Sequence, residues 1–219
     1  WLADISHELR TPLAILKSEL EAIDDGIREF DEETLNSLIH EVKRINTLVN
    51  DLYELTLSDL GAMKYQMTEI DIKTNIESSV ESYKERYDAA GVEIISDLEE
   101  VGMILGDQHR LTQLFTNLLE NTLRYTDNPG QLVIKMMDND DQIIISFTDS
   151  PPGVEAETLS KIFDRFFREE LSRSREMGGA GLGLSICSEI IEAHSGSIQA
   201  KQADIGGLEI IIKLNKGDL

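Results

Sequence analysis

The sequence predicts a chain of two parts, an α-helical hairpin followed by an α/β sandwich of two layers. Within residues 1–59, Leu, Ile and Val recur every three or four residues in two successive runs, which is the spacing of one apolar stripe per helix. From residue 69 onward, β-rich runs are mixed with helical ones, as in a sheet covered by helices. With 219 residues, the chain is long enough for both parts to bury a core.

The first helix is expected over residues 1–26, and Asp31 suits the N-cap of the second. A two-helix hairpin with one apolar stripe on each helix cannot bury both stripes well. Pairing with a second copy solves this, so residues 1–59 are expected to form a dimeric four-helix bundle. The stripes consist of Leu2, Ile5, Leu9, Leu13, Leu16, Leu20, Ile23 and Ile27, and of Leu35, Leu38, Val42, Ile45, Val49 and Leu52.

Gly61 breaks the second run, so residues 60–68 are expected to be a linker and residues 69–219 a second domain. Gly91 suits the residue after a helix end, and Asp107 suits an N-cap. The expected helices of this domain are 72–90, 107–125, 155–167 and 182–194, and the expected strands are 92–98, 102–105, 132–137, 143–148, 197–201 and 208–214.

The net charge of −22 argues against nucleic acid as a partner, because phosphate backbones need basic patches. Cys187 is the only cysteine, so no internal disulfide is possible. No run of about 18 apolar residues is present, so no membrane span is expected in this stretch. Because the sequence opens on Trp1 in the middle of the apolar pattern, we expect a fragment whose N-terminal neighbour has been removed.

The stretch Ser6-His7-Glu8-Leu9-Arg10-Thr11-Pro12-Leu13 lies on the first expected helix. His7 is two residues from its apolar neighbours on either side, about 200° of helical rotation, so its imidazole points away from the stripe. Thr11 is one turn further and shares its face. Pro12 has no amide hydrogen and is expected to bend the helix beside the histidine. Since a neutral imidazole is a nucleophile at physiological pH, His7 is predicted to present a reactive group to a large partner.

Three polar side chains lie on one face of the helix expected over 107–125: Asn117, Asn121 and Arg124. An Asn oxygen can ligate Mg²⁺, and the metal keeps waters and phosphates as its other ligands. The guanidinium suits the phosphate chain itself. The alternative interpretation is an ordinary solvated helix face.

The run Gly178-Gly179-Ala180-Gly181-Leu182-Gly183-Leu184 precedes an apolar helix, where glycines let backbone amides approach an anion. The run matches neither a P-loop nor the dinucleotide fingerprint. A flexible linker is therefore the alternative to an anion-binding loop. Asp149 ends a strand at a turn, where its carboxylate can accept a hydrogen bond from an amino group such as that of adenine. Five cations can offset the repulsion of a triphosphate or are ordinary solvated charges: Lys161, Arg165, Arg168, Arg173 and Arg175.

Taken in their order along the chain, these segments resemble the sensor histidine kinases of two-component signalling, over nearly all 219 residues. Within that family the chain is most similar to the BaeS type of bacterial envelope-stress sensor. One departure is Pro151, where the family usually has glycine, which leaves the detailed shape of that loop open. The family boxes are the phosphoacceptor box Ser6–Leu13, the asparagine box Asn117–Asn121 with Tyr125-Thr126, the first glycine box Asp149–Gly153, the phenylalanine box Phe163–Arg168 and the second glycine box Gly179–Leu184.

This resemblance implies a sandwich of the Bergerat type, the ATP-binding fold shared with type II topoisomerases and with mismatch-repair and heat-shock ATPases. It implies ATP and Mg²⁺ as cofactors, with the metal on Asn121. Asn117 and Arg124 would contact phosphates. Tyr125 would pack near the nucleotide, and Asp149 would bind the adenine amino group. The other nucleotide-binding residues that it implies are Gly153, Arg168, Gly179, Gly181, Leu182, Gly183 and Leu184.

The resemblance also implies that His7 accepts the γ-phosphoryl group of ATP, that Glu8 orients the imidazole and handles its proton, and that Thr11 positions water when a phosphorylated partner is hydrolysed. That partner would be the receiver domain of a response regulator, phosphorylated on an aspartate. The fragment would lie on the cytoplasmic side of a bacterial inner membrane, joined to it only through the missing N-terminal part. Two alternatives stay open, a nucleotide-gated dimeric adaptor with little transfer activity and an ATPase of the same fold.

Overall fold

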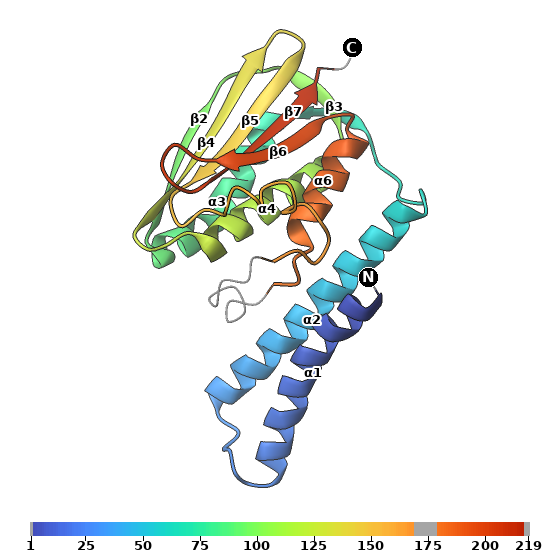
Figure 1. The fold of residues 1–219 in the computed structure, drawn as a ribbon, viewed down its shortest axis with the longest axis vertical. Coiled ribbons are helices and arrows are strands. Elements are labelled where there is room, and N and C mark those ends of the chain that lie inside the picture. The colour runs from blue at the N-terminus through green and yellow to red at the C-terminus, as the bar shows by residue number, and fades with distance from the viewer. Residues whose placement is uncertain (1, 169–178, 217–219) are drawn as a thin grey trace. The chain divides into compact units, whose positions relative to one another are not determined.

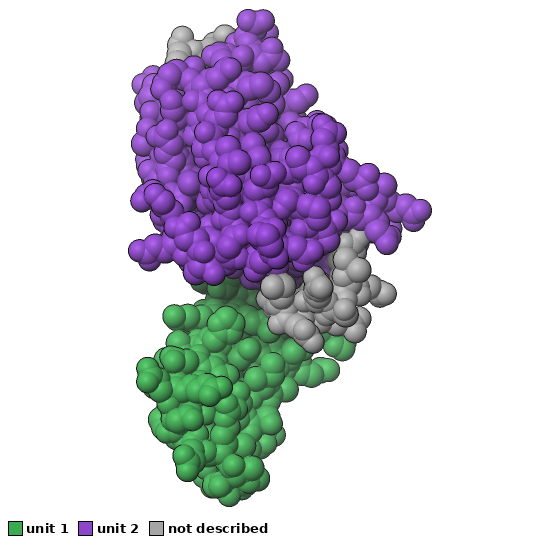
Figure 2. All heavy atoms as spheres, turned by 90° about the vertical axis from the view of Figure 1, so that its left-hand side faces the viewer, with its two compact units in different colours: residues 1–63 green, residues 64–219 purple. Residues whose placement is uncertain are grey.

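The computed structural model describes residues 2–168 and 179–216, and the chain divides into two compact units, residues 1–63 and 64–219 (Figure 2). The first unit is a hairpin of α1 (Leu2–Asp24) and α2 (Glu32–Asp59). Asp31 caps α2 as predicted, since its carboxylate accepts a hydrogen bond from the Thr34 amide at 2.8 Å. α1 continues through Pro12. Among the described helices, none is both long and apolar enough to cross a membrane.

The hairpin has an apolar side that is exposed in the single chain. Leu48 and Leu55 of α2 are buried, although neither belongs to the predicted stripe of that helix. The predicted stripes contribute instead an exposed set that repeats every seven residues on each helix. This exposed set consists of Leu13 and Leu20 on α1, of Ile27 in the turn that follows α1, and of Leu35, Val42 and Val49 on α2.

The second unit is built on a five-stranded sheet with the order β2-β4-β5-β7-β6. β2 and β4 are parallel, and the other neighbouring pairs are antiparallel. Three helices lie on one face of this sheet (Figure 1). The strands are β2 (Val92–Leu98), β4 (Gly130–Asn139), β5 (Gln142–Asp149), β6 (Ser197–Gln202) and β7 (Leu208–Asn215), and the helices are α3 (Ile72–Ala90), α4 (Gln108–Tyr125) and α6 (Gly183–Ala193).

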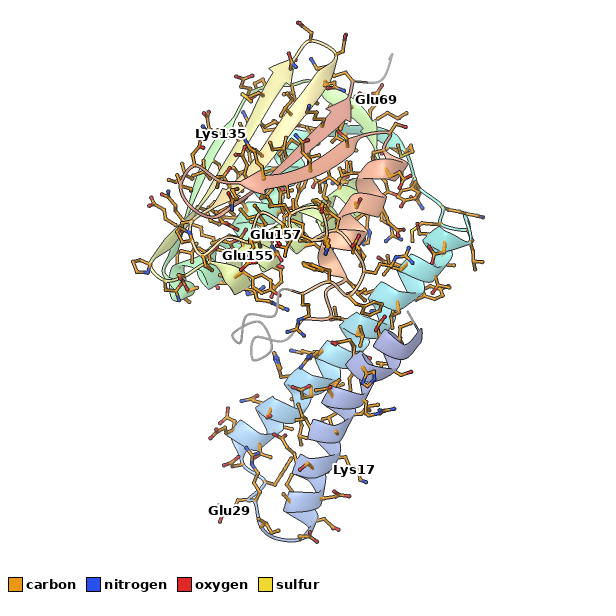
Figure 3. The ribbon with its side chains drawn as sticks, viewed as in Figure 1. Lys17, Glu29, Glu69, Lys135, Glu155 and Glu157 are labelled. Carbon is orange, nitrogen blue, oxygen red and sulfur yellow. The ribbon has the colours of Figure 1, made fainter. Side chains whose placement is uncertain are left out.

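The core of this unit lies between the sheet and the helices. Alternate residues of β4 and β5 are buried, because side chains of a strand point to opposite faces in turn. Phe147 of β5 stacks on Phe115 of α4, with ring centroids 6.1 Å apart. Lys135 of β4 is exposed on the opposite face (Figure 3). The sheet is thus apolar toward the helices. The contact between Phe147 and Phe115 places the carboxyl end of β5 next to α4.

Most predicted elements are confirmed with ends shifted by one or two residues, but one predicted helix does not form and one strand was missed. Residues 155–167 do not form a helix; they form successive turns, in which amides bond the carbonyl three residues earlier, as from Lys161 to Thr158. The strand β1 (Thr68–Asp71) was not predicted, and it pairs antiparallel with β3 (Met103–Gly106). Ile70 is the one buried residue of this four-residue strand, and a single apolar position gives no alternating pattern from which a strand could be predicted.

Candidate functional site

Helices α4 and α6 pack against each other and carry the centre of the site. Asn117 of α4 donates a hydrogen bond from Nδ2 to the carbonyl of Gly183, the first residue of α6, at 3.4 Å. One turn earlier on α4, the carbonyl of Leu114 accepts a hydrogen bond from the buried Sγ of Cys187. Asn121 lies one turn beyond Asn117 on the same face of α4. The structure therefore brings the predicted asparagine face to the start of the helix that follows the glycine-rich run.

Asp149 ends β5 as a buried carboxyl group, with only 7% of its surface exposed. Its Oδ1 accepts a hydrogen bond from the Leu208 amide at 2.6 Å, and the Thr122 side chain forms a second hydrogen bond. Burial raises the pKa of this carboxyl group to about 6, although both hydrogen bonds act to lower it. The carboxyl group is thus an acceptor held in a fixed position and poorly solvated.

The loop between β6 and β7 supports Asp149, and sequence reasoning did not identify it. A Cβ atom at Gly207 would lie 2.1 Å from the Asp149 carbonyl oxygen, so only glycine allows this approach. A Cβ atom at Gly153, where φ is +68°, would lie 2.9 Å from the carbonyl oxygen of Gly207. The ring of Pro151 packs against Gly206, and Asp149 keeps its contacts with a proline at that position. The adjacent glycines Gly206 and Gly207 were the only local signal for this loop in the sequence.

The glycine-rich run and the phenylalanine box meet at Gly181. Its φ is +69°, and a Cβ atom there would lie 2.7 Å from the carbonyl oxygen of Phe167. The Gly181 carbonyl accepts a hydrogen bond from the Phe166 amide at 2.9 Å. Leu182 is buried immediately before α6, and Leu184 lies in its first turn. These contacts fix the entry to α6 at the edge of the asparagine face.

The predicted cations are placed differently from one another. Arg124 lies against the glycine-rich run, since a Cβ atom at Gly179 would be 2.0 Å from Arg124 Nη1. Arg165 pairs instead with Glu189 of α6, which balances its charge. Arg168 is half-buried at the end of the described stretch, and Tyr125, at the end of α4, is partly exposed. Arg173, Arg175 and Gly178 lie outside the described residues.

His194 is a structural residue of this site that sequence reasoning left aside. It follows α6, and its ring is buried. Nε2 accepts a hydrogen bond from the Asp107 amide at 2.9 Å, and Nδ1 lies 2.7 Å from the Ile190 carbonyl. These partners require the proton on Nδ1. His194 thereby ties the end of α6 to the start of α4, the pair of helices that carries Gly183 and Asn117.

The predicted phosphoacceptor stretch lies in the other unit, on α1. His7 is exposed, as the spacing predicted. The Thr11 hydroxyl donates to the His7 carbonyl at 3.3 Å, which places it one turn from the imidazole on the same helix. Glu8 is partly buried beside them. An exposed imidazole with a carboxylate and a hydroxyl nearby has the groups needed for phosphoryl acceptance and for positioning water.

Two family models match the chain, one for each unit. The His Kinase A (phospho-acceptor) domain matches residues 1–61. The histidine kinase-, DNA gyrase B- and HSP90-like ATPases match residues 106–218, which is more than half of the chain. The chain belongs to the histidine kinase family. The kinase therefore has the predicted fold class, a helical hairpin joined to the α/β sandwich of these ATPases.

Individual relatives agree with this assignment. The kinase is 47% identical over 214 residues to the signal transduction histidine-protein kinase BaeS of Escherichia coli K12, covering 98% of this chain and 46% of BaeS. It is 35% identical over 219 residues to the sensor protein SrrB of Staphylococcus aureus MRSA252, covering 99% of this chain and 38% of SrrB. The chain thus spans less than half the length of either relative.

A solved structure supports the same fold. The Acinetobacter baumannii histidine kinase AdeS matches with a TM-score of 0.83 at 28% sequence identity, over 97% of this chain and 98% of that one. The predicted resemblance to the BaeS type is confirmed by the identity to BaeS.

Proposed function

We propose that this chain is the catalytic core of a sensor histidine kinase that autophosphorylates His7 with ATP and passes the phosphoryl group to an aspartate of a response regulator. The observation that carries the proposal is the presence, in one chain, of a phosphoacceptor domain with an exposed histidine and an ATPase domain. The chain matches less than half the length of BaeS and of the sensor protein SrrB. We therefore also propose that it forms part of a longer sensor and lies on the cytoplasmic side of a bacterial inner membrane.

Nucleotide binding is assigned to the second unit. Asp149 would accept a hydrogen bond from the adenine amino group, because a buried carboxylate gains most from a donor that replaces lost solvent. Asn117, Arg124 and Arg168 would contact the phosphates, and Tyr125 would pack near the base. The backbone around Gly153 and over Gly179, Gly181, Leu182, Gly183 and Leu184 would line the rest of the site.

Mg²⁺ would enter together with the nucleotide. Within residues 2–168 and 179–216, no group of three or more His, Cys, Asp or Glu side chains is placed to hold a metal ion. Mg²⁺ commonly uses one or two protein ligands and fills its shell with water and phosphate oxygens. Asn121 would supply the protein ligand, and the ion would neutralise charge on the phosphates.

The transfer step requires His7 of the first unit to meet the nucleotide bound by the second unit. A ring nitrogen of His7 would form the new bond to the γ-phosphorus as the bond to the bridging β,γ-oxygen breaks, so that ADP leaves. Glu8 would orient the ring and take its proton. We propose the boundaries 1–59 and 69–219 for the two domains, with residues 60–68 as the hinge. The Gln66 amide donates a hydrogen bond to Asp107 Oδ2 at 2.8 Å, which ties Gln66 to the second unit. The bending point of the hinge is therefore expected before Gln66.

The homodimer is proposed from the exposed apolar set of the hairpin. Leu13 and Leu20 are more than half exposed, and Leu35, Val42 and Val49 repeat at the same interval on α2. A seven-residue apolar repeat on both helices suits a four-helix bundle formed with a second copy. Association would remove this surface from water, which is the main favourable term in such assemblies.

The experiment that tests the function is incubation of the whole chain with γ-labelled ATP and Mg²⁺, followed by acid and base treatment. Phosphohistidine loses its label in acid and retains it in base, and we expect this behaviour. ATP binding without any label would instead favour the nucleotide-gated adaptor. Steady phosphate release that does not depend on His7 would favour the ATPase.

We further propose that the kinase dephosphorylates its regulator, with Thr11 positioning the water. Thr11→Ala is therefore expected to slow phosphate release from a phosphorylated receiver domain by about tenfold, and more than it slows labelling of His7. Alanine is a good helix former, so α1 should persist. Release of inorganic phosphate from the purified regulator is the measurement.

Thr47→Ala is the matched control for Thr11→Ala. The Thr47 hydroxyl donates to the Lys43 carbonyl at 3.1 Å, so this variant removes the same kind of bond from the other helix. An equal loss of phosphate release in both variants would contradict the role of Thr11.

A further inference from the structure

A cluster of charged and aromatic side chains joins α3 to α4 beside the asparagine face. Arg86 Nη1 lies 2.8 Å from Glu120 Oε2, and Arg124 Nη2 lies 3.4 Å from Glu120 Oε1. Glu120 and Arg124 are one turn apart on α4, whereas Arg86 comes from α3 and belongs to none of the family boxes. One carboxylate is therefore shared by two guanidinium groups, and the closer contact is the one to Arg86.

Arg86 is held in place from its other side. Its guanidinium carbon lies 4.8 Å from the centroid of the Tyr83 ring, a cation–π arrangement. The Tyr83 hydroxyl also donates to Glu120 Oε2, at 3.4 Å. Burial alone would raise the pKa of Glu120, but the hydrogen bond and the charge of Arg86 outweigh it, so the pKa is lowered. Glu120 is thus an ionised carboxylate, oriented mainly by residues of α3.

Arg124 extends from this cluster toward the proposed phosphate site. Its Nη1 lies against the backbone at Gly179, so the same guanidinium touches the carboxylate and the glycine-rich run. The two guanidinium groups and one carboxylate carry a net charge of +1. If Arg86 were absent, Glu120 and Arg124 would form a neutral pair one turn apart, a spacing that favours close ion pairing on a helix.

We propose that Arg86 is a positioning residue for nucleotide binding, which holds Glu120 so that the charge of Arg124 is presented to a polyphosphate instead of being neutralised. The inference rests on the proposed function, because it takes the ligand of this site to be ATP. It adds a residue from α3 that would not touch the nucleotide. Because Arg86 would act only on the binding of phosphate charge, its replacement should weaken the binding of ATP but not that of adenosine.

The expected effect is a loss of ATP affinity that a second substitution reverses. Arg86→Gln should weaken ATP binding by the whole chain by about three- to fivefold, the range for a partly exposed ion pair. Binding of adenosine should stay within about twofold, since the base contacts Asp149 and not this cluster. Adding Glu120→Gln to Arg86→Gln should restore ATP affinity, because Arg124 no longer faces a carboxylate. The variant Arg86→Lys should retain most of the ATP affinity.

The test is titration calorimetry with ATP and with adenosine, on wild type and these variants, at fixed Mg²⁺ and salt. Lys84→Gln removes the same charge from an exposed position of α3 and should leave both affinities unchanged. Wild-type ATP affinity in Arg86→Gln, or a double variant no better than Arg86→Gln, would overturn the inference while the proposed function stands. A wild-type chain that binds no adenine nucleotide would overturn the proposed function, and this inference with it.

Discussion

Replacing His7 with glutamine should abolish ATP-dependent labelling of the chain, by at least about a hundredfold. The amide of glutamine has similar polarity to imidazole but is not a nucleophile, so no bond to phosphorus can form. His7 is exposed, and substitutions at exposed sites usually change stability by no more than about 0.5 kcal/mol. The measurement is base-stable, acid-labile label after incubation with γ-labelled ATP.

His40→Gln provides the matched control, because His40 is also exposed and lies on the second helix of the same hairpin. It should be labelled like the wild type. ATP binding by His7→Gln should be unchanged, since the proposed nucleotide residues belong to the other unit. Full labelling of His7→Gln would show that another residue accepts the phosphoryl group, and this would contradict the central step of the proposed function.

Replacing Asp149 with asparagine should weaken ATP binding by about 10- to 100-fold, the value of a buried hydrogen bond to a charged group. The amide can still offer its oxygen to the Leu208 N–H, but its NH₂ group then meets another donor, the adenine amino group. Adenosine should lose affinity by a similar factor, since the contact is to the base. Calorimetric titration with both ligands measures the effect.

The same substitution should stabilise the fold at neutral pH. The pKa of Asp149 is raised to about 6 from an ordinary 3.8, so the native state binds more protons than the unfolded chain between these values. The stability contributed by the protonated group is therefore present below about pH 4 and is lost as the pH rises through about 6. The free energy of unfolding falls by about 3 kcal/mol at most over this range. Asp149→Asn should remove this part of the pH dependence of the unfolding free energy.

Urea unfolding at pH 4.5 and pH 7.5 measures that difference, with Asp97→Asn as a control at an exposed position of β2. The control should keep the wild-type pH dependence. An Asp149→Asn variant that is less stable than the wild type at pH 7.5 would show that its carboxylate stabilises the loop by more than its burial costs. Loss of ATP binding together with a gain in stability would identify Asp149 as a residue retained for binding.

Local chemistry in the sequence determined much of this protein. The caps at Asp31 and Asp107 and the left-handed Gly91 were predictable, because each depends on residues within one helical turn. The exposure of His7 followed from its offset from the apolar stripe. The order of the family boxes was sufficient to indicate the family, which the matches to both domains confirm.

Only the tertiary structure decided which distant residues support these groups. Leu208 lies 59 residues beyond the Asp149 that it orients, and Arg86 reaches Glu120 from another helix. The pairing of β1 with β3 and the hydrogen bond from the Phe166 amide to the Gly181 carbonyl likewise depend on neighbours outside the segment itself. Periodicity and capping report interactions between residues three or four apart, whereas these contacts arise when helices and strands pack, so the sequence read locally holds no signal for them.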